Sequence, residues 1–299
     1  MKEELLDFLK MNDVKIKENV KLCELSPVKI GAEADLIAYP DSLKKLANLL
    51  HYLETTKINY KILGRMSNVL PPDDKYTPMI VKTDLLNDVL IKDQSATLQT
   101  GVSLSRLSSM LASAGLSGVE PLSGIPGSVG GAIFGNAGAF GREISDLIKK
   151  VIAFDRGDGR IIQIDRDEAE FGYRDSAFKK SPLVVLEAEI QLNASDPQAV
   201  RAEVERYKAI RREKQPFSQP SLGSTFKRPG KGLYAAKMID ECGLKGAGIG
   251  GVQISEKHAG FIVNRGGARA KDYLALSDLA IKCVKEKFGI ELEREIEIL

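Results

Sequence analysis

Histidine and cysteine are scarce in this sequence. It has only two histidines, His51 and His258, and three cysteines, Cys23, Cys242 and Cys283, with no CxxC or other metal-ligand spacing. Two histidines are too few for a histidine-rich metal site, and they leave few candidates for a hydrolytic triad that depends on histidine. We expect no metal site, and the odd, scattered cysteines indicate a reduced, cytoplasmic chain.

Long apolar runs and an excess of one charge are missing too. No run approaches the roughly 18 to 20 residues of a membrane span, and the segment "MKEELLDFLKMNDVKIKE" lacks the apolar centre of a signal peptide. The 43 basic and 41 acidic residues leave a net charge of +2. We therefore expect no membrane span and no nucleic-acid partner. The 299 residues, 43% of them hydrophobic, suit a globular protein of two domains.

Helical and strand periodicities alternate along the chain, which predicts an α+β protein. Leucines at helical spacing predict helices over 42–53 and 103–115, the second capped by Ser103 and ended by Gly115. The charged helix 197–214 and the proline- and glycine-rich segment 215–232 mark a domain boundary. The other expected elements are strands at 59–63, 78–83, 96–100, 149–154, 160–165, 183–192, 259–264 and 289–299, and helices at 233–243 and 271–287.

A glycine tract, "GIPGSVGGAIFGNAGAFG", occupies residues 124–141. Seven of its eighteen residues are glycine, and none is charged. Bare backbone lets a ligand approach closely, and exposed N–H groups cradle anions, so a pyrophosphate is one guest to expect. The tract is not a P-loop, and it matches a Rossmann fingerprint only loosely. The alternative is a tight, buried crossing of the backbone between layers, and composition leaves both open.

Two further segments have both a functional and a structural interpretation. In "LGRMSNVL" (63–70), Ser67 and Asn68 follow a strand and either bind a phosphate or form an ordinary turn. In "FGYRDSAFK" (171–179), Arg174 has the planar, two-pronged geometry that binds carboxylates. The alternative for this second segment is a surface loop with an Arg–Asp pair.

The last third of the chain carries isolated candidates. Ser224, in "SLGSTFKRP", is not in a nucleophile elbow, so it is either a proton donor or a turn serine. His258 precedes an apolar strand and either contacts a ligand or has a structural role. Four glutamates lie on one face of the closing strand, and periodicity cannot choose among them: Glu291, Glu293, Glu295 and Glu297.

Taken together, these segments resemble the UDP-N-acetylenolpyruvoylglucosamine reductase family, also called UDP-N-acetylmuramate dehydrogenases. The similarity covers nearly the whole chain. It is carried, in the family's order, by "SPVKIGAEADLIAYP", "SGIPGSVGGAIFGNAGAFGREI", "FGYRDSAFK", "KQPFSQPSLGSTFKRP", "GLKGAGIGGVQISEKHAGFIVN" and "VKEKFGIELEREIEI". The chain resembles the shorter subtype, which lacks a tyrosine-bearing insertion. The resemblance implies a two-part FAD-binding domain of the vanillyl-alcohol-oxidase (PCMH) type and a smaller α+β substrate domain.

The resemblance also implies domain limits and an activity. Residues 1–205 would form the FAD-binding region, with an N-terminal lobe reaching residue 82, followed by a substrate domain at 206–290 and a catalytic C-terminal strand at 291–299. The implied reaction reduces the enolpyruvyl ether of UDP-N-acetylglucosamine to UDP-N-acetylmuramate for peptidoglycan synthesis. NADPH reduces a non-covalent FAD, whose N5 passes hydride to the substrate. We expect a monomer.

Residue roles follow from the same resemblance. Arg174 and Glu295 would stabilise the enolate that develops on the substrate carboxylate, and Ser224 would donate the proton, polarised by Lys214 or Lys227. The implied substrate-binding residues are Tyr173, Lys214, Lys245 and His258. The implied cofactor-binding residues are Gly64, Ser67, Asn68, Gly124, Ile125, Pro126, Gly127, Ser128, Gly130, Gly131, Asn136, Ala137 and Gly138.

The chain departs from the family pattern at three positions. Met66 replaces the second glycine of the flavin turn, which puts a Cβ where backbone contact with phosphate is expected and predicts weaker FAD binding. Gly135 stands where a larger residue is common, and Glu297 where a basic residue often follows the catalytic strand. Two alternatives therefore remain: a catalytically weakened flavin- or UDP-sugar-binding relative, and a sugar oxidase of the same flavin superfamily.

Overall fold

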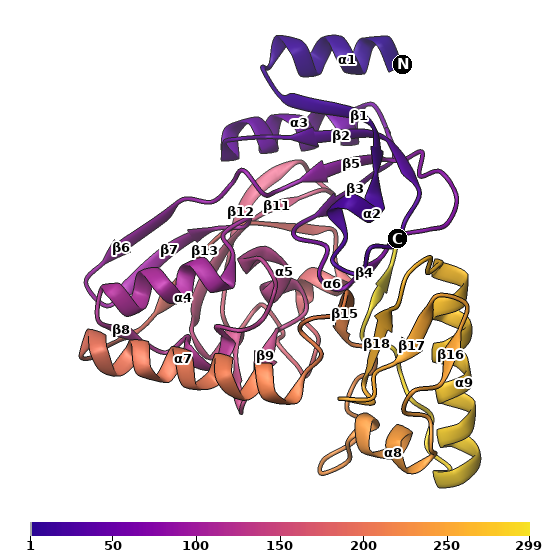
Figure 1. Ribbon diagram of the computed structural model, residues 1–299. Helices are drawn as coiled ribbons and strands as arrows, with labels where there is room; N and C mark the ends of the chain where they lie inside the picture. Colours follow the sequence, from indigo (N-terminus) through magenta and orange to yellow (C-terminus); the bar gives the residue numbers. More distant parts are fainter. Residues whose placement is uncertain (1) are drawn as a thin grey trace. The chain divides into compact units, whose positions relative to one another are not determined.

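The computed structural model describes residues 2–299, and the chain forms two compact units, each assembled from segments distant in the sequence (Figure 1). The predicted boundary after residue 205 lies close to the one after Ala209. The prediction differs in keeping residues 19–35 and 66–77 with the first region, whereas both belong to unit 2. Unit 1 consists of Met1–Glu18, Leu36–Arg65 and Pro78–Ala209, and unit 2 of Asn19–Asp35, Met66–Thr77 and Ile210–Leu299.

The first sheet has the strand order β1-β2-β5-β3. Strands β2 and β3 both pair with β5 in parallel, and the helix α3 makes the crossover that such pairing needs. Helix α3 begins after Ser42, whose Oγ accepts the N–H of Lys45 at 3.3 Å, and its leucine stripe is buried, as predicted. The elements are α1 (Lys2–Met11), β1 (Lys15–Lys21), α2 (Leu22–Leu25), β2 (Glu33–Tyr39), α3 (Leu43–Thr55), β3 (Tyr60–Leu63), β4 (Val69–Leu70) and β5 (Met79–Lys82).

A five-stranded antiparallel sheet, in the order β12-β11-β13-β7-β6, forms the rest of unit 1. On β13, Ala188 and Ile190 are fully buried and alternate with more exposed polar residues, as the sequence predicted. The elements are β6 (Val89–Lys92), β7 (Ser95–Gln99), α4 (Leu104–Ser113), β8 (Leu116–Ser117), α5 (Val129–Phe134), β9 (Gly138–Ala139), β10 (Arg142–Glu143), β11 (Ile148–Asp155), β12 (Arg160–Asp165), α6 (Ala177–Lys180), β13 (Leu183–Gln191), β14 (Asn193–Ala194) and α7 (Pro197–Lys214), with short 3₁₀ helices at Glu120–Leu122 and Ile144–Asp146.

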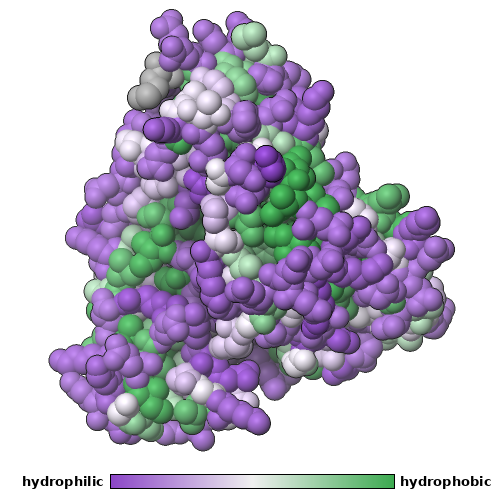
Figure 2. Space-filling model, turned by 180° about the vertical axis from the view of Figure 1, so that it is seen from behind, coloured by the Kyte–Doolittle hydropathy of each residue, from purple (hydrophilic) through white to green (hydrophobic). Residues whose placement is uncertain are grey.

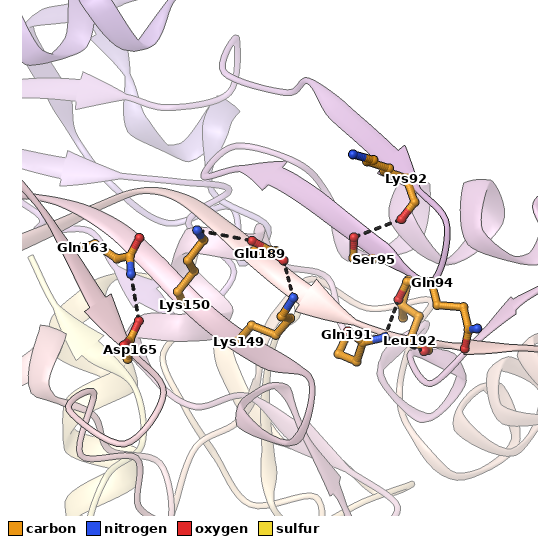
Figure 3. Close-up of polar contacts among 10 residues, drawn as sticks. All are labelled: Lys92, Gln94, Ser95, Lys149, Lys150, Gln163, Asp165, Glu189, Gln191 and Leu192. Carbon is orange, nitrogen blue, oxygen red and sulfur yellow. Dashed lines mark hydrogen bonds and ion pairs between the residues drawn. The ribbon is translucent and has the colours of Figure 1, made fainter.

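Polar side chains lie along the strands of this second sheet (Figure 3). Glu189 on β13 lies between two lysines of β11, with its carboxylate oxygens 2.6 Å from Lys149 Nζ and 3.5 Å from Lys150 Nζ. The hydrogen bond and charge of Lys149 lower the pKa of Glu189. On the neighbouring strand β12, Gln163 donates to Asp165 at 3.0 Å. The cross-strand pairs of Glu189 and the Gln163–Asp165 pair within β12 make this a solvated face, opposite the buried side chains of β13.

Unit 2 is built on the antiparallel sheet β15-β18-β17-β16. Helix α9 packs on this sheet, and its Tyr273 is completely buried, with its hydroxyl 2.9 Å from Thr225 Oγ1. Burial raises the pKa of Tyr273 well above its usual range, so the ring remains a neutral core residue. The elements are β15 (Ser221–Ser224), α8 (Ala235–Glu241), β16 (Gly248–Ile249), β17 (Val252–Ile254), β18 (Phe261–Asn264), α9 (Ala270–Phe288) and β19 (Glu297–Ile298).

The closing strand predicted over 289–299 is wrong for most of its length. Only Glu297–Ile298 forms a strand, β19, which pairs in parallel with β4. Half of the predicted apolar face is buried: Leu292 and Ile296 are 3% and 6% exposed, whereas Ile290 is half-buried and Ile298 is 55% exposed. Alternation therefore identified part of the buried side. It could not show that this segment pairs with a partner strand over only two residues.

Hydrophobic residues are distributed between buried clusters and a largely hydrophilic surface. The face in Figure 2 is mainly hydrophilic, with hydrophobic residues gathered in patches. Two clusters lie in unit 1 and one in unit 2. Within residues 2–299, no helix has both the length and the apolar character required to cross a bilayer.

Candidate active site

The glycine tract (residues 124–141) enters the short helix α5, which the sequence did not predict. Ser128 begins the helix, and its Oγ accepts the N–H of Gly131 at 3.4 Å. The N–H groups of Val129 and Gly130 each donate at 2.8 Å to backbone carbonyls, those of Val102 and Thr100. This part of the tract is therefore a tight backbone crossing, one of the two interpretations left open above.

The glycines of the two predicted cofactor segments serve different purposes. A Cβ on Gly130 would lie 1.9 Å from Thr100 Oγ1, and a Cβ on Gly64 would lie 2.4 Å from Ser128 Oγ, so packing excludes side chains there. Gly131 differs, because its nearest neighbour would be Ser128 Oγ at an ordinary 3.5 Å and the residue is exposed. Glycine costs a helix about 0.5–1 kcal/mol relative to alanine. Since neither packing nor backbone conformation requires it, the bare surface at Gly131 fits close approach by a ligand.

The cofactor turn (residues 64–68) contains Met66 in the left-handed region, with φ of 56°. This conformation explains why glycine suits the position. The Met66 side chain is only 3% exposed, so it lies inside the protein and does not cover the outer side of the turn. The Cβ thus presents less of an obstacle to a phosphate than the sequence predicted. Ser67 and Asn68 follow, both half-buried.

The Arg174 loop (residues 172–176) is attached to the end of the glycine tract. Arg174 has a left-handed φ of 55°, and its Nη2 donates to the carbonyl of Gly138 at 3.0 Å. Its guanidinium carbon lies 5.2 Å from the centre of the exposed Tyr173 ring. The buried Ser176 Oγ donates to the carbonyl of Phe134 at 2.8 Å. Unit 1 thus brings two predicted site residues, Tyr173 and Arg174, together with the tract.

Asn136 has a structural function that the sequence did not reveal. Its side chain is 1% exposed, and its Nδ2 donates to Glu143 Oε2 and to the carbonyl of Gly172, both at 2.8 Å. Its Oδ1 accepts the N–H of Ser145 at 3.3 Å. The amide therefore joins the tract to the Arg174 loop, and Asn136 is a buried structural residue in this part of the protein.

In unit 2, main-chain bonds bring Ser224 and Glu295 onto adjoining segments. Ser224 is exposed at the end of β15 and follows Gly223, whose φ is 81°. The N–H of Glu295 donates to the carbonyl of Thr225 at 2.8 Å. The carbonyl of Glu295 accepts from Asn68 Nδ2 at 2.9 Å. Two predicted catalytic residues and one predicted cofactor residue therefore lie in one cluster.

The remaining predicted substrate residues, Lys214, Lys245 and His258, also lie in unit 2. Lys214 is exposed at the end of α7, and Lys245 Nζ lies 2.7 Å from Asp240 Oδ2. His258 packs edge-on against Phe261, with ring centres 4.9 Å apart. Burial lowers the pKa of His258, and the charge of Lys245 lowers it further, so the imidazole is neutral near pH 7.

The sequence did not single out two cationic residues, Lys82 and Arg211. Lys82, at the end of β5, is 3% exposed, donates to the carbonyl of Gly64 and pairs with Asp84 Oδ2 at 2.9 Å. A lysine at the end of an apolar strand was the available signal. Arg211 has a buried Nε without a hydrogen-bond partner, and burial lowers its pKa to about 10. Nothing in the charged pattern of 197–214 distinguished it.

Surface hollows do not identify the site. One of about 600 Å³ lies along residues 6–18 and Asp41, and another of about 480 Å³ lies beside the Lys149–Glu189 pair. None of the predicted site residues lines either of them. Within residues 2–299, no three His, Cys, Asp or Glu side chains are grouped so as to hold a metal.

Comparison with known proteins covers both units. Residues 34–165 match the family model of an FAD binding domain, and residues 215–299 match that of the UDP-N-acetylenolpyruvoylglucosamine reductase C-terminal domain. The UDP-N-acetylenolpyruvoylglucosamine reductase of Clostridium tetani is 40% identical over 286 residues, which are 94% of this chain and 92% of that protein.

Solved structures agree with the predicted fold. The UDP-N-acetylenolpyruvylglucosamine reductase of Thermus caldophilus superposes with a TM-score of 0.79 at 30% identity, covering 95% of this chain and 98% of that one. A variant of berberine bridge enzyme shares the fold alone, with a TM-score of 0.51 at 15% identity over 65% of this chain and 44% of that one. The α+β class with a PCMH-type FAD-binding part is thereby confirmed. The chain belongs to the UDP-N-acetylenolpyruvoylglucosamine reductase family.

Proposed function

We propose that Arg174, Ser224 and Glu295 are the catalytic residues of this FAD-containing, NADPH-dependent oxidoreductase. Its substrate is the enolpyruvyl ether of UDP-N-acetylglucosamine, and its product serves peptidoglycan precursor synthesis. Family membership supports the activity. The observation that carries the residue roles is the Glu295 N–H bond to Thr225, because it holds the carboxylate-bearing segment beside the exposed Ser224.

The glycine tract and the cofactor turn are compatible with bound FAD. The cofactor turn and the glycine tract pack against each other, since a Cβ on Gly64 would meet Ser128. Gly131 and the turn Gly124–Gly127 leave largely bare backbone accessible beside that contact. A flat ring system and a pyrophosphate both need such clearance. When bound, FAD supplies the hydride chemistry of the reaction.

The protein's own residues handle charge and proton. Hydride addition to an enolpyruvyl group places negative charge on the carboxylate, which the guanidinium of Arg174 stabilises and Glu295 helps to orient. The Ser224 hydroxyl donates the proton to the α-carbon. Because a hydroxyl is a weak acid, it needs positive charge nearby, and Lys227, three residues on, pairs with Glu293 at 2.5 Å. Lys214, Lys245 and His258 contact the substrate in this proposal.

Replacing Ser224 tests the proposal. Positioned acid catalysis contributes roughly 10²- to 10⁴-fold. In Ser224→Ala, we expect substrate to reoxidise the reduced flavin more slowly by that factor, while NADPH reduces the flavin at the normal rate. Stopped-flow absorbance of the flavin separates the two half-reactions. Ser221→Ala, in the same strand, is the matched control and should leave both rates unchanged. An equal loss in both half-reactions of Ser224→Ala contradicts the assignment.

The enzyme is further proposed to work as a cytoplasmic monomer. The balanced charge and the scattered cysteines support this location. Sedimentation of the FAD-loaded protein at several concentrations tests the oligomeric state, and a concentration-dependent dimer contradicts it.

A further inference from the structure

Asn68 joins the cofactor turn to the segment that carries Glu295. Its side-chain Nδ2 donates to the Glu295 carbonyl at 2.9 Å, and its own carbonyl accepts the N–H of Glu297 at 2.8 Å. The two bonds lie on either side of Ile296, which is buried. One residue of the turn therefore bonds to the backbone of the proposed catalytic glutamate and to that of Glu297, two residues further on.

The other side of Glu295 is held from the strand of the proposed proton donor. Its N–H donates to Thr225, the neighbour of Ser224. The Glu295 main chain thus has one bond to the Ser224 segment and one to the cofactor turn. A shift of the turn moves one of these two attachments and leaves the other, which changes where the carboxylate lies relative to Ser224.

The turn has a conformation that needs support. Met66 occupies the left-handed region, and a non-glycine residue stays there only where its surroundings hold it. Val69 N–H to the Met66 carbonyl, at 3.3 Å, closes the turn on the protein side. A ligand that contacts Ser67 and Asn68 would support the turn on its other side. The geometry of the turn would then depend on whether that ligand is bound.

We propose that Asn68 is a positioning residue that transmits occupancy of the cofactor turn to Glu295, so that the carboxylate is fully placed only when the flavin is bound. This inference rests on the proposed function for the identity of the ligand and the role of Glu295. The chemistry remains that of Arg174, Ser224 and Glu295.

Hydrogen exchange tests the coupling without measuring turnover. In the wild-type protein, saturating FAD should slow exchange of the Glu295 and Glu297 amides. In Asn68→Ala, measured at saturating FAD, that slowing should be lost. Asn264→Ala is the matched control, because Asn264 Nδ2 makes the same kind of bond in unit 2, to the carbonyl of Val28 at 2.8 Å. It should keep the FAD-dependent slowing. Full retention of the slowing in Asn68→Ala overturns the proposal.

Half-reaction rates give the second readout. Loss of one positioning hydrogen bond should slow flavin reoxidation by substrate about 2- to 10-fold more than it slows reduction by NADPH. Equal slowing of both steps overturns the coupling. Wild-type enzyme whose flavin the enolpyruvyl substrate does not reoxidise contradicts the proposed function instead, and the exchange result still decides the coupling.

A second variant tests the same coupling without changing the Asn68 side chain, which contacts the cofactor in this proposal. Glu297→Pro removes the main-chain donor to the Asn68 carbonyl and also fixes φ at that position, and Glu297→Ala controls for loss of the side chain. We expect FAD to slow exchange at Glu295 less in Glu297→Pro than in Glu297→Ala. Identical slowing in the two variants overturns the proposal.

Discussion

In unit 1 the candidate site is made mainly of main chain, whereas in unit 2 it is made of side chains on hydrogen-bonded segments. The unit 1 part offers bare backbone at Gly131 and a left-handed Arg174 resting on the Gly138 carbonyl. The unit 2 part offers Ser224 and Glu295, joined through Thr225. In the proposed roles, the unit 1 residues give clearance for a cofactor and the unit 2 residues handle proton and charge. Arg174 is the exception, because it is a proposed catalytic residue that lies in unit 1.

Arg174→Lys tests that exception and should have the largest effect. The charge remains, but the planar pair of donors is lost, so we expect reoxidation by substrate to slow about 10²- to 10³-fold. Single-turnover absorbance measures it. Arg166→Lys is the control, since Arg166 also donates to a backbone carbonyl, that of Ser145. A normal rate in Arg174→Lys removes Arg174 from the chemistry.

Gly130→Ala tests the packed part of the glycine tract. The added methyl meets Thr100, and overpacking of this kind lowers the free energy of unfolding by about 1–3 kcal/mol. Urea denaturation of the FAD-free protein measures it. An unchanged midpoint would show that the crossing can adjust.

Gly131→Ala tests the exposed part of helix α5, and its effects should differ from those of Gly130→Ala. Stability of the FAD-free protein should stay equal or rise by up to about 1 kcal/mol, because alanine is the better helix former. FAD affinity should fall about tenfold, since the methyl occupies ligand space. Flavin fluorescence titration decides: unaltered affinity means that tight packing explains the whole tract.

Met66→Gly tests whether the cofactor turn, unlike the glycine tract, tolerates a side chain without loss of FAD affinity. Its expected effect is the smallest of the four. Glycine relieves about 1–2 kcal/mol of left-handed strain but loses about 1.5–3 kcal/mol of side-chain burial. We expect a net loss of about 1 kcal/mol in thermal or urea unfolding, with FAD affinity nearly unchanged. A strong gain in affinity would show that the Met66 Cβ does obstruct the ligand.

After residue 40, local periodicity predicted every helix of seven or more residues and every strand of five or more, but it missed most of the shorter elements. The alternation of residues 183–192 and the Ser103 cap both express short-range physics, and both are confirmed. Helix α5 was missed because glycine is a poor helix former, and its geometry comes from bonds to Val102 and Thr100. The closing strand was overextended because alternation reports burial and not pairing.

For a related reason, the sequence indicated some features of the site and not others. Motif order indicated Arg174, Ser224 and Glu295, whose roles remain predictions, but not which parts of the chain hold them. The function of the Asn136 amide, the buried Lys82 and the Asn68–Glu295 bond all depend on contacts between distant segments. A single sequence carries no local signal for such contacts.

The interleaved construction of unit 2 has a consequence for biosynthesis. Asn68 and its partner Glu295 are separated by 227 positions. Segments 19–35 and 66–77 therefore leave the ribosome long before residues 210–299, and residues 78–209 of unit 1 are synthesised in the interval. During translation the early segments of unit 2 have no native partners, which exposes them to aggregation. The bonds between Asn68 and residues 295–297 can form only once residues 295–297 have been synthesised, so the segment of the proposed catalytic Glu295 takes its place late in synthesis.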